Sequence, residues 1–188
     1  MTRATRLSLE ETWKHLEEQN EEMPRADDGE PFVPPGIPSQ DDEELGYSFF
    51  RNGVEDGDYS GLTLPRTYFC RSSLTRVTFQ NSDLHESRMC WNDFIECDFS
   101  GADLSKCDLR SSTYEKCNFS DADLRGADLR RAYIVECTFA GSLLEGAVAL
   151  PDGHPEACED GTLTQSLSTE QRAAMTWTDD AGDEPDGG

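Results

Sequence analysis

The chain is poor in basic residues and in apolar residues. Its 188 residues include 16 Lys and Arg against 39 Asp and Glu, which gives a formal net charge of −23 at pH 7. Hydrophobic residues make up 35% of the chain, a low share for a globular protein. No stretch is long and apolar enough to span a membrane, and the N-terminal residues MTRATRLSLEETWKHLEEQ lack the apolar run of a signal peptide. We therefore expect a cytoplasmic protein that does not contact a membrane.

The chain also lacks the sequence motifs of catalysis and of metal binding. It has no nucleophile elbow, no Gly-rich phosphate loop and no CxxC pair. The three histidines, His15, His85 and His154, are scattered along the chain, which does not favour a metal site. We therefore expect no enzymatic activity, no metal and no cofactor.

A period of five residues organises the middle of the chain. In the stretch from Cys97 to Leu129, CDFSGADLSKCDLRSSTYEKCNFSDADLRGADL, every fifth residue is large and apolar and the residue two positions before it is small. The same register runs without a break from Tyr59 to Leu144. Amphipathic helices repeat at about 3.6 residues and half-buried strands at about 2, so neither explains the pattern. The repeating unit must be a five-residue bend.

The segments ADLSK, ADLRG and CDFSG resemble the pentapeptide-repeat family, whose consensus is a small residue, Asp or Asn, Leu or Phe, and two polar residues. The resemblance covers residues 57–149. It implies an all-β fold, a right-handed quadrilateral β-helix of about 4.5 coils with four pentapeptides in each coil. Residues twenty positions apart should then stack, and like residues do recur at that spacing. The predicted core columns are aromatic (Phe79, Phe99, Phe119 and Phe139) and leucine (Leu84, Leu104, Leu124 and Leu144).

Seven cysteines raise the question of disulfides, and Cys97, Cys117 and Cys137 should stack in successive coils. The number of cysteines is odd, the chain lacks a signal peptide, and Cys97, Cys117 and Cys137 occupy the small position of the repeat. These features argue against disulfides. We expect reduced, buried thiols that act as small apolar residues.

The segment before the repeats is divided into three parts. Residues 1–24 are predicted to form an N-terminal helix, begun by a capping box of Ser8 and Glu11. We expect its apolar stripe to dock on the body or on a neighbouring subunit rather than to recruit a partner. Residues 25–46 should be an extended, acidic, Pro-rich linker, and residues 47–56 a cap over the open apolar end of the solenoid. The cap would use the aromatic residues Tyr47, Phe49 and Phe50.

The segment after the repeats is divided into two parts. Residues 150–177 are predicted to form a C-terminal cap with a short helix from Glu170 to Trp177, begun by a capping box of Ser168 and Gln171. Residues 178–188, TDDAGDEPDGG, should be a disordered acidic tail.

Aspartates on the all-leucine face are the first candidate for a functional site. The consensus itself explains an Asp before each apolar centre, because its short side chain can hydrogen-bond the bent backbone. The consensus does not explain their arrangement, because Asp83, Asp103 and Asp123 should form a ladder of carboxylates with rungs about 4.8 Å apart. Each adjacent exposed pair would cost on the order of 1 kcal/mol, which a positively charged partner would relieve.

Two functions fit these features. The first is a non-enzymatic protein-binding module, an immunity or adaptor protein that blocks a partner such as a toxin through a flat face of the rod. Exposed aromatic residues would anchor such an interface, and Trp91, Tyr68 and Tyr133 are the candidates. The alternative, implied by the resemblance, is a DNA mimic that binds DNA gyrase or topoisomerase IV through the aspartate ladder and protects the enzyme from inhibitors.

Charge favours the first function. Residues 57–149 hold 14 acidic and 10 basic residues, a net charge of only −4, and basic corners such as Arg66, Arg71 and Arg76 interrupt any continuous anionic face. Under either function we expect a protein partner, no direct contact with nucleic acid, and a monomer or a homodimer.

Overall fold

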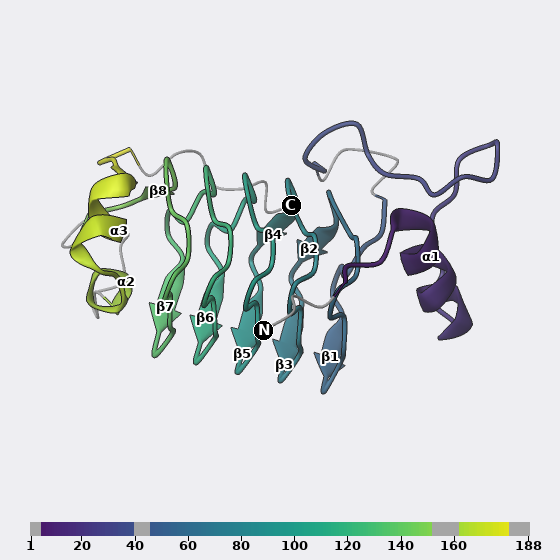
Figure 1. The fold of residues 1–188 in the computed structure, drawn as a ribbon, viewed down its shortest axis with the longest axis horizontal. Helices are drawn as coiled ribbons and strands as arrows, with labels where there is room; N and C mark the ends of the chain where they lie inside the picture. The colour runs from purple at the N-terminus through teal and green to yellow at the C-terminus, as the bar shows by residue number, and fades with distance from the viewer. Residues whose placement is uncertain (1–4, 40–45, 152–161, 181–188) are drawn as a thin grey trace.

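The computed structural model describes residues 5–39, 46–151 and 162–180. The chain winds into a rod of stacked coils, with helix α1 at one end and helices α2 and α3 at the other (Figure 1). Five three-residue strands, one from each successive coil, form a parallel sheet in the order β1-β3-β5-β6-β7. These strands are β1 (Gly53–Glu55), β3 (Ser73–Thr75), β5 (Asp93–Ile95), β6 (Thr113–Glu115) and β7 (Tyr133–Val135). We call the outer side of this sheet the sheet face.

The register between coils is twenty residues on every side of the rod. In the sheet, Ser73 pairs with Asp93, and Asp93 pairs with Thr113. A second, two-stranded parallel sheet joins β2 (Tyr68–Cys70) to β4 (Arg88–Cys90). Single parallel bridges form the ladders of the other two sides, one through Thr63, Asp83, Asp103, Asp123 and Leu143 and one through Asp58, Thr78, Asp98, Asn118 and Thr138. This arrangement confirms the predicted all-β, four-sided β-helix.

Each corner of a coil is made by a left-handed residue two positions after the apolar centre. Arg66, Trp91 and Lys106 have φ values of 55°, 58° and 57° at such corners. This conformation is uncommon for residues other than glycine, so the stacking of the coils must maintain it. At Gly101, with φ of 66°, an added Cβ would lie 2.5 Å from Oδ1 of Asn81, so the Asn81 side chain would have to shift to admit a larger residue.

The core consists of side chains stacked one above another inside the rod. The rings of Phe79 and Phe99 are 5.1 Å apart with planes at 7°, and those of Phe99 and Phe119 are 5.1 Å apart at 3°. All eight residues of the predicted aromatic and leucine columns are 0–1% exposed. The stacking of identical residues follows from the twenty-residue register, because each ring rests on an equivalent ring in the next coil.

Helix α1 (Leu9–Glu18) covers one end of the rod. The side chain of Ser8 accepts a hydrogen bond from the backbone N–H of Glu11, and the side chain of Glu11 accepts one from Ser8, which is the capping box expected here. Trp13 is 1% exposed and Leu16 is 0% exposed. The helix docks through Thr12, whose Oγ1 accepts a hydrogen bond of 2.9 Å from the backbone N–H of Thr63.

The residues predicted as the N-terminal cap form part of a further coil instead. Ser48 bridges to Tyr68, β1 pairs with β3, and the ring of Phe49 stacks on that of Phe69 at 4.5 Å. Tyr47 and Phe49 are buried, whereas Phe50 is 37% exposed. The predicted start of the solenoid at residue 57 is therefore wrong. Phe49 continues the register of five, but Tyr47 occupies the position where the repeat has a small residue.

The described part of the predicted linker, residues 25–39, is not extended throughout. Its first residues turn back through an antiparallel bridge between Arg25 and Pro31. This turn is fastened to α1, because Nε1–H of Trp13 donates a hydrogen bond of 2.7 Å to the carbonyl of Pro24.

The opposite end is covered by α2 (Thr162–Ser166) and α3 (Thr169–Ala174). The predicted capping box of Ser168 and Gln171 is present. The helix does not reach Trp177, because Met175 is extended and Thr176–Trp177 form strand β9, which pairs in parallel with β8 (Val148–Ala149). Leu167 and Met175 are buried against the core. Most of the predicted disordered tail, from residue 181 onward, lies outside the described residues.

In the described parts of the chain, every helix is too short or too polar to cross a membrane.

Candidate functional site

The predicted aspartate ladder is present on the side of the rod opposite the sheet face. Asp83, Asp103 and Asp123 are joined rung to rung by parallel bridges. We call this side the aspartate face. The side chains are half-buried rather than fully exposed, with 16% exposure for Asp83 and 19% for Asp123.

Each of these aspartates stabilises the bend of its own pentapeptide by a hydrogen bond to the backbone. Oδ1 accepts a hydrogen bond from the backbone N–H two residues later, from His85 to Asp83 at 3.2 Å, from Ser105 to Asp103 at 3.0 Å and from Arg125 to Asp123 at 3.1 Å. This is the local role that the repeat consensus predicts for an Asp at this position.

The ladder is largely neutralised within the chain, which the sequence did not lead us to expect. The Arg125 guanidinium forms an ion pair of 2.5 Å with Asp123, and this hydrogen bond raises the pKa of Arg125. A guanidinium nitrogen of Arg6 lies 3.8 Å from Oδ2 of Asp83. The hydroxyl of Ser105 donates a hydrogen bond of 2.6 Å to Asp103. Asp83 and Asp123 therefore have cationic partners within the chain, whereas the side-chain partner of Asp103 is the neutral hydroxyl of Ser105.

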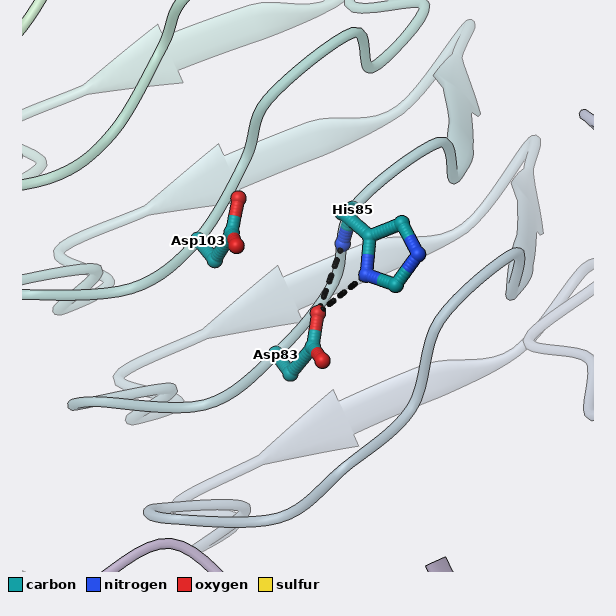
Figure 2. Close-up of side chains that lie close together, drawn as sticks. All are labelled: Asp83, His85 and Asp103. Carbon is teal, nitrogen blue, oxygen red and sulfur yellow. Dashed lines mark hydrogen bonds and ion pairs between the residues drawn. The ribbon is translucent and has the colours of Figure 1, made fainter.

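Asp83, His85 and Asp103 come together on this face (Figure 2). Nδ1 of His85 lies 2.6 Å from Oδ1 of Asp83, and one possible ligand atom from each of the three residues lies within 4.8 Å of the others. Two carboxylates and an imidazole are groups that bind divalent cations. The nearby Arg6 opposes a cation at Asp83, however, so the arrangement serves first as a hydrogen-bonded Asp–His pair beside a second carboxylate.

The sequence reasoning did not assign His85 to this face, because it treated the histidines as scattered. The signal was present, since His85 follows Asp83 by two residues within one pentapeptide and Asp103 is twenty residues after Asp83. In a rod with this register, that spacing places both carboxylates beside one imidazole.

The three aromatic candidates do not lie together with the aspartates. Tyr68 is 2% exposed on β2, with its ring 5.9 Å from that of Phe50, so the expectation of an exposed anchor at Tyr68 is wrong. Trp91 is 39% exposed at the corner before β5, and Tyr133 is half-buried at the start of β7. Tyr68, Tyr133 and the aspartates thus lie on different sides of the rod, and the six predicted residues do not make one surface.

The basic corners at Arg66, Arg76 and Lys106 are paired with acids from neighbouring coils. Arg66 binds Glu86 at 2.8 Å, and Lys106 binds the same carboxylate at 3.1 Å. The hydrogen bond from Arg66, with a smaller contribution from Lys106, lowers the pKa of Glu86. Arg76 likewise binds Asp56 at 2.7 Å. These corners alternate in charge along the rod, because residues of opposite sign recur at twenty-residue spacing.

The six described cysteines are free thiols and all are buried; Cys158 lies outside the described residues. In the predicted inward column, Sγ–H groups donate to main-chain carbonyls of the preceding coil. Cys97 donates to Leu74 at 3.3 Å and Cys117 to Phe94 at 3.3 Å. These thiols pack as small core residues, as their place in the repeat indicated.

Comparison with known proteins agrees with this architecture. Residues 60–90, 72–110 and 115–148 match the family model described as pentapeptide repeats (8 copies). No curated protein matches the sequence significantly.

Three solved structures illustrate the likeness. A pentapeptide repeat protein from the thylakoid lumen of Arabidopsis thaliana is 28% identical, covering 65% of this chain and 72% of its own, with a TM-score of 0.31. QnrB1, a plasmid-mediated fluoroquinolone resistance protein, is 16% identical, covering 57% and 71%, with a TM-score of 0.37. HetL of the cyanobacterium Nostoc, involved in the regulation of heterocyst differentiation, is 16% identical, covering 56% and 74%, with a TM-score of 0.33.

Proposed function

We propose, proceeding from the fact that this chain belongs to the pentapeptide-repeat family, that it is a non-enzymatic protein-binding module acting through a flat face of its β-helix. An immunity or adaptor protein is the class of function that this describes. Proteins of this family are generally non-catalytic, and the described residues offer a regular surface rather than a catalytic constellation.

The observation that carries the proposal is the sheet face. Five strands lie in register, so their outward side chains form straight rows across neighbouring coils. Ile95 and Val135 lie half-buried in one of these rows, and Trp91 is exposed at the edge of the face. A flat surface with a large aromatic residue at its margin suits a protein partner, because aromatic residues supply much of the energy of interfaces.

The aspartate face supports the DNA-mimic alternative less well. DNA mimicry needs a continuous row of unneutralised negative charge, whereas Asp123 is paired with Arg125 and Asp83 lies near Arg6. Glu86 is likewise held between Arg66 and Lys106 at the adjacent corner. Two of the three ladder carboxylates thus have a cationic partner within the chain, so the geometry supports protein binding through the sheet face better.

The test is affinity capture with the full chain, followed by titration of the captured protein against variants of the two faces. Trp91→Ala combined with Ile95→Glu should weaken binding about 10-fold or more, because it removes an aromatic anchor and places a charge in the contact. Asp103→Asn combined with Asp123→Asn is the matched change on the opposite face and should leave the affinity unchanged.

The reverse result would overturn the proposal. A partner lost with the aspartate variant and kept with the sheet-face variant would place binding on the aspartate face. A DNA gyrase supercoiling assay then decides whether that partner is a type II topoisomerase, since inhibition by the natural chain should weaken when Asp83, Asp103 and Asp123 are all changed to Asn.

A further inference from the structure

Strands β2 and β4 differ from the strands of the sheet face. All three residues of each are buried, whereas β3, β5, β6 and β7 bury only their central residue. Tyr68, Cys70 and Cys90 form a small buried cluster of their own, separate from the main core. Two thiols of neighbouring coils thus lie outside the inward columns and are nevertheless shielded from solvent.

The two thiols are directly opposed. Cys70 pairs with Cys90 in the parallel register, and their Sγ atoms are 3.3 Å apart. Paired residues of adjacent strands lie about 4.8 Å apart, which falls within the Cα separation of about 4.4–6.8 Å that a disulfide requires. A side-chain rotation that brings the sulfur atoms to about 2 Å would join them without a change in backbone register.

A buried cation lies beside this pair. Arg88 is 7% exposed, and its Nε–H donates a hydrogen bond of 3.3 Å to Sγ of Cys90. The hydrogen bond from Cys90 is the main cause that lowers the pKa of Cys70 to about 7, with Tyr68 and Arg88 adding to the effect. Burial and the charge of Asp108 act in the opposite direction. Cys70 is therefore the more acidic thiol of the pair, and the hydrogen bond with Cys70 raises the pKa of Cys90.

We propose that Cys70 and Cys90 are a redox-active pair of thiols that a peroxide converts to a disulfide between two coils. The Cys70 thiolate attacks one oxygen of hydrogen peroxide, and the O–O bond breaks. The hydroxide released takes up a proton and leaves as water, so Cys70 becomes a sulfenic acid. The sulfur of Cys90 then attacks Sγ of Cys70, the S–O bond breaks, and the second hydroxide leaves as water with the Cys90 proton.

The electrons balance over these two reaction steps. Two thiols give up two electrons and two protons in total, and one peroxide becomes two waters. A dithiol reductant reverses the step by thiol–disulfide exchange. Burial of both sulfur atoms favours a small oxidant such as hydrogen peroxide, and it disfavours links to a second chain.

The inward cysteines provide an internal comparison. Cys97 and Cys117 are also one coil apart, and a hydrogen bond from Cys117 lowers the pKa of Cys97. Both thiols also donate to main-chain carbonyls, however, and the charge that acts on Cys97 is the Asp98 carboxylate rather than a guanidinium. Under mild oxidation we expect the pair beside Arg88 to react before the inward column.

The experiment treats the reduced full chain with hydrogen peroxide under native conditions and stops the reaction with an alkylating agent in denaturant. Cleavage before aspartate separates the relevant cysteines, because residues 58–82 contain Cys70, residues 83–92 contain Cys90 and residues 93–97 contain Cys97. Mass spectrometry should find the first two fragments linked, with the loss of two hydrogens. The rate of linkage should rise with pH with a midpoint near the Cys70 pKa of about 7.

Two variants test the individual roles. In Cys90→Ser, Cys70 should stop at the sulfenic acid, which dimedone traps, and no link to residues 83–92 should form. Arg88→Met should slow the reaction several-fold, and Arg88→Lys, which keeps the positive charge, should slow it less. Circular dichroism of each variant shows whether the coil is intact.

Either of two results would overturn the proposal, and both can be obtained with the natural chain. One is that Cys70 and Cys90 remain fully alkylatable at a peroxide concentration that oxidises added glutathione. The other is that a bond between Cys97 and Cys117 forms at the same rate.

Discussion

Phe99 illustrates how a single residue supports this fold. It is 0% exposed, and its ring lies between the parallel rings of Phe79 and Phe119. It also meets Phe94 edge-on at 5.5 Å. A change at this position therefore affects the coils above and below as well as its own.

Replacing Phe99 by Ala should lower the free energy of unfolding by about 3–5 kcal/mol, because it removes apolar burial and leaves a cavity between two rings. Phe99→Asp should prevent folding of the coil, since it also buries a charge. Phe50→Ala, at a ring that is 37% exposed, is the control and should cost much less. Urea unfolding followed by circular dichroism measures all three, and a stable Phe99→Asp variant with an unchanged spectrum would contradict the inward assignment.

At the scale of the element, the side chain of Gln171 ties helix α3 to the last coil. Gln171 completes the capping box with Ser168, and its Nε2 donates hydrogen bonds of 2.7 Å to the carbonyl of Phe139 and 3.1 Å to that of Ser142. The same amide group thus caps its own helix and satisfies carbonyls at the open end of the rod, where no further coil can do so.

Gln171→Ala should destabilise the protein by about 1–2 kcal/mol, because it removes the capping interaction and leaves buried carbonyls without this donor. Gln165→Ala, at an exposed position of α2, is the matched control and should change the stability little. Thermal unfolding compares the two variants. Equal stability of both would mean that the hydrogen bonds of Gln171 do not stabilise the end of the rod.

Helix α1 shows which element predictions the sequence supported. Its start followed from Ser8 and Glu11, because a capping box is a local pattern. Its early end at Glu18 and the turn through Arg25 and Pro31 did not follow, because they depend on docking against the first coil and on the bond from Trp13 to Pro24.

At the scale of the whole molecule, the rod ends without neighbours to continue its stacking. A solenoid with open ends exposes its core columns and can associate end to end. Helix α1 covers one such end with Trp13 and Leu16, both almost fully buried. The position of α1 therefore decides whether this end is available to a second copy.

Changing both Trp13 and Leu16 to Asp should release α1, lower the thermal stability and produce larger species, because the first coil would expose its apolar end. Lys14→Asp combined with Gln19→Asp places carboxylates at an exposed position of the same helix and at its exposed C-cap, and should leave the assembly state unchanged. Light scattering coupled to size-exclusion chromatography measures the mass of each variant. No change in mass or stability with the first pair would contradict a capping role for α1.

The sequence by itself determined the coil. A large residue stands at every fifth position, and a small residue lies two places earlier in each repeat. Only a repeated bend can bury these residues, and like residues at twenty-residue spacing set the stacking. The core columns could be predicted for this reason, since inward positions obey the same packing constraint in every coil.

Only the tertiary structure decided what happens at the outward positions. Apart from the Asp or Asn before each apolar centre, the repeat imposes little on residue type there, so contacts depend on which side chains of neighbouring coils and flanking segments meet. The burial of Tyr68, the approach of Cys70 to Cys90, the place of His85 beside Asp83 and the pairing of Asp123 with Arg125 are all of this kind. Local pattern specifies inward packing because it recurs, whereas outward chemistry depends on which individual side chains the coil register and the flanking segments bring together.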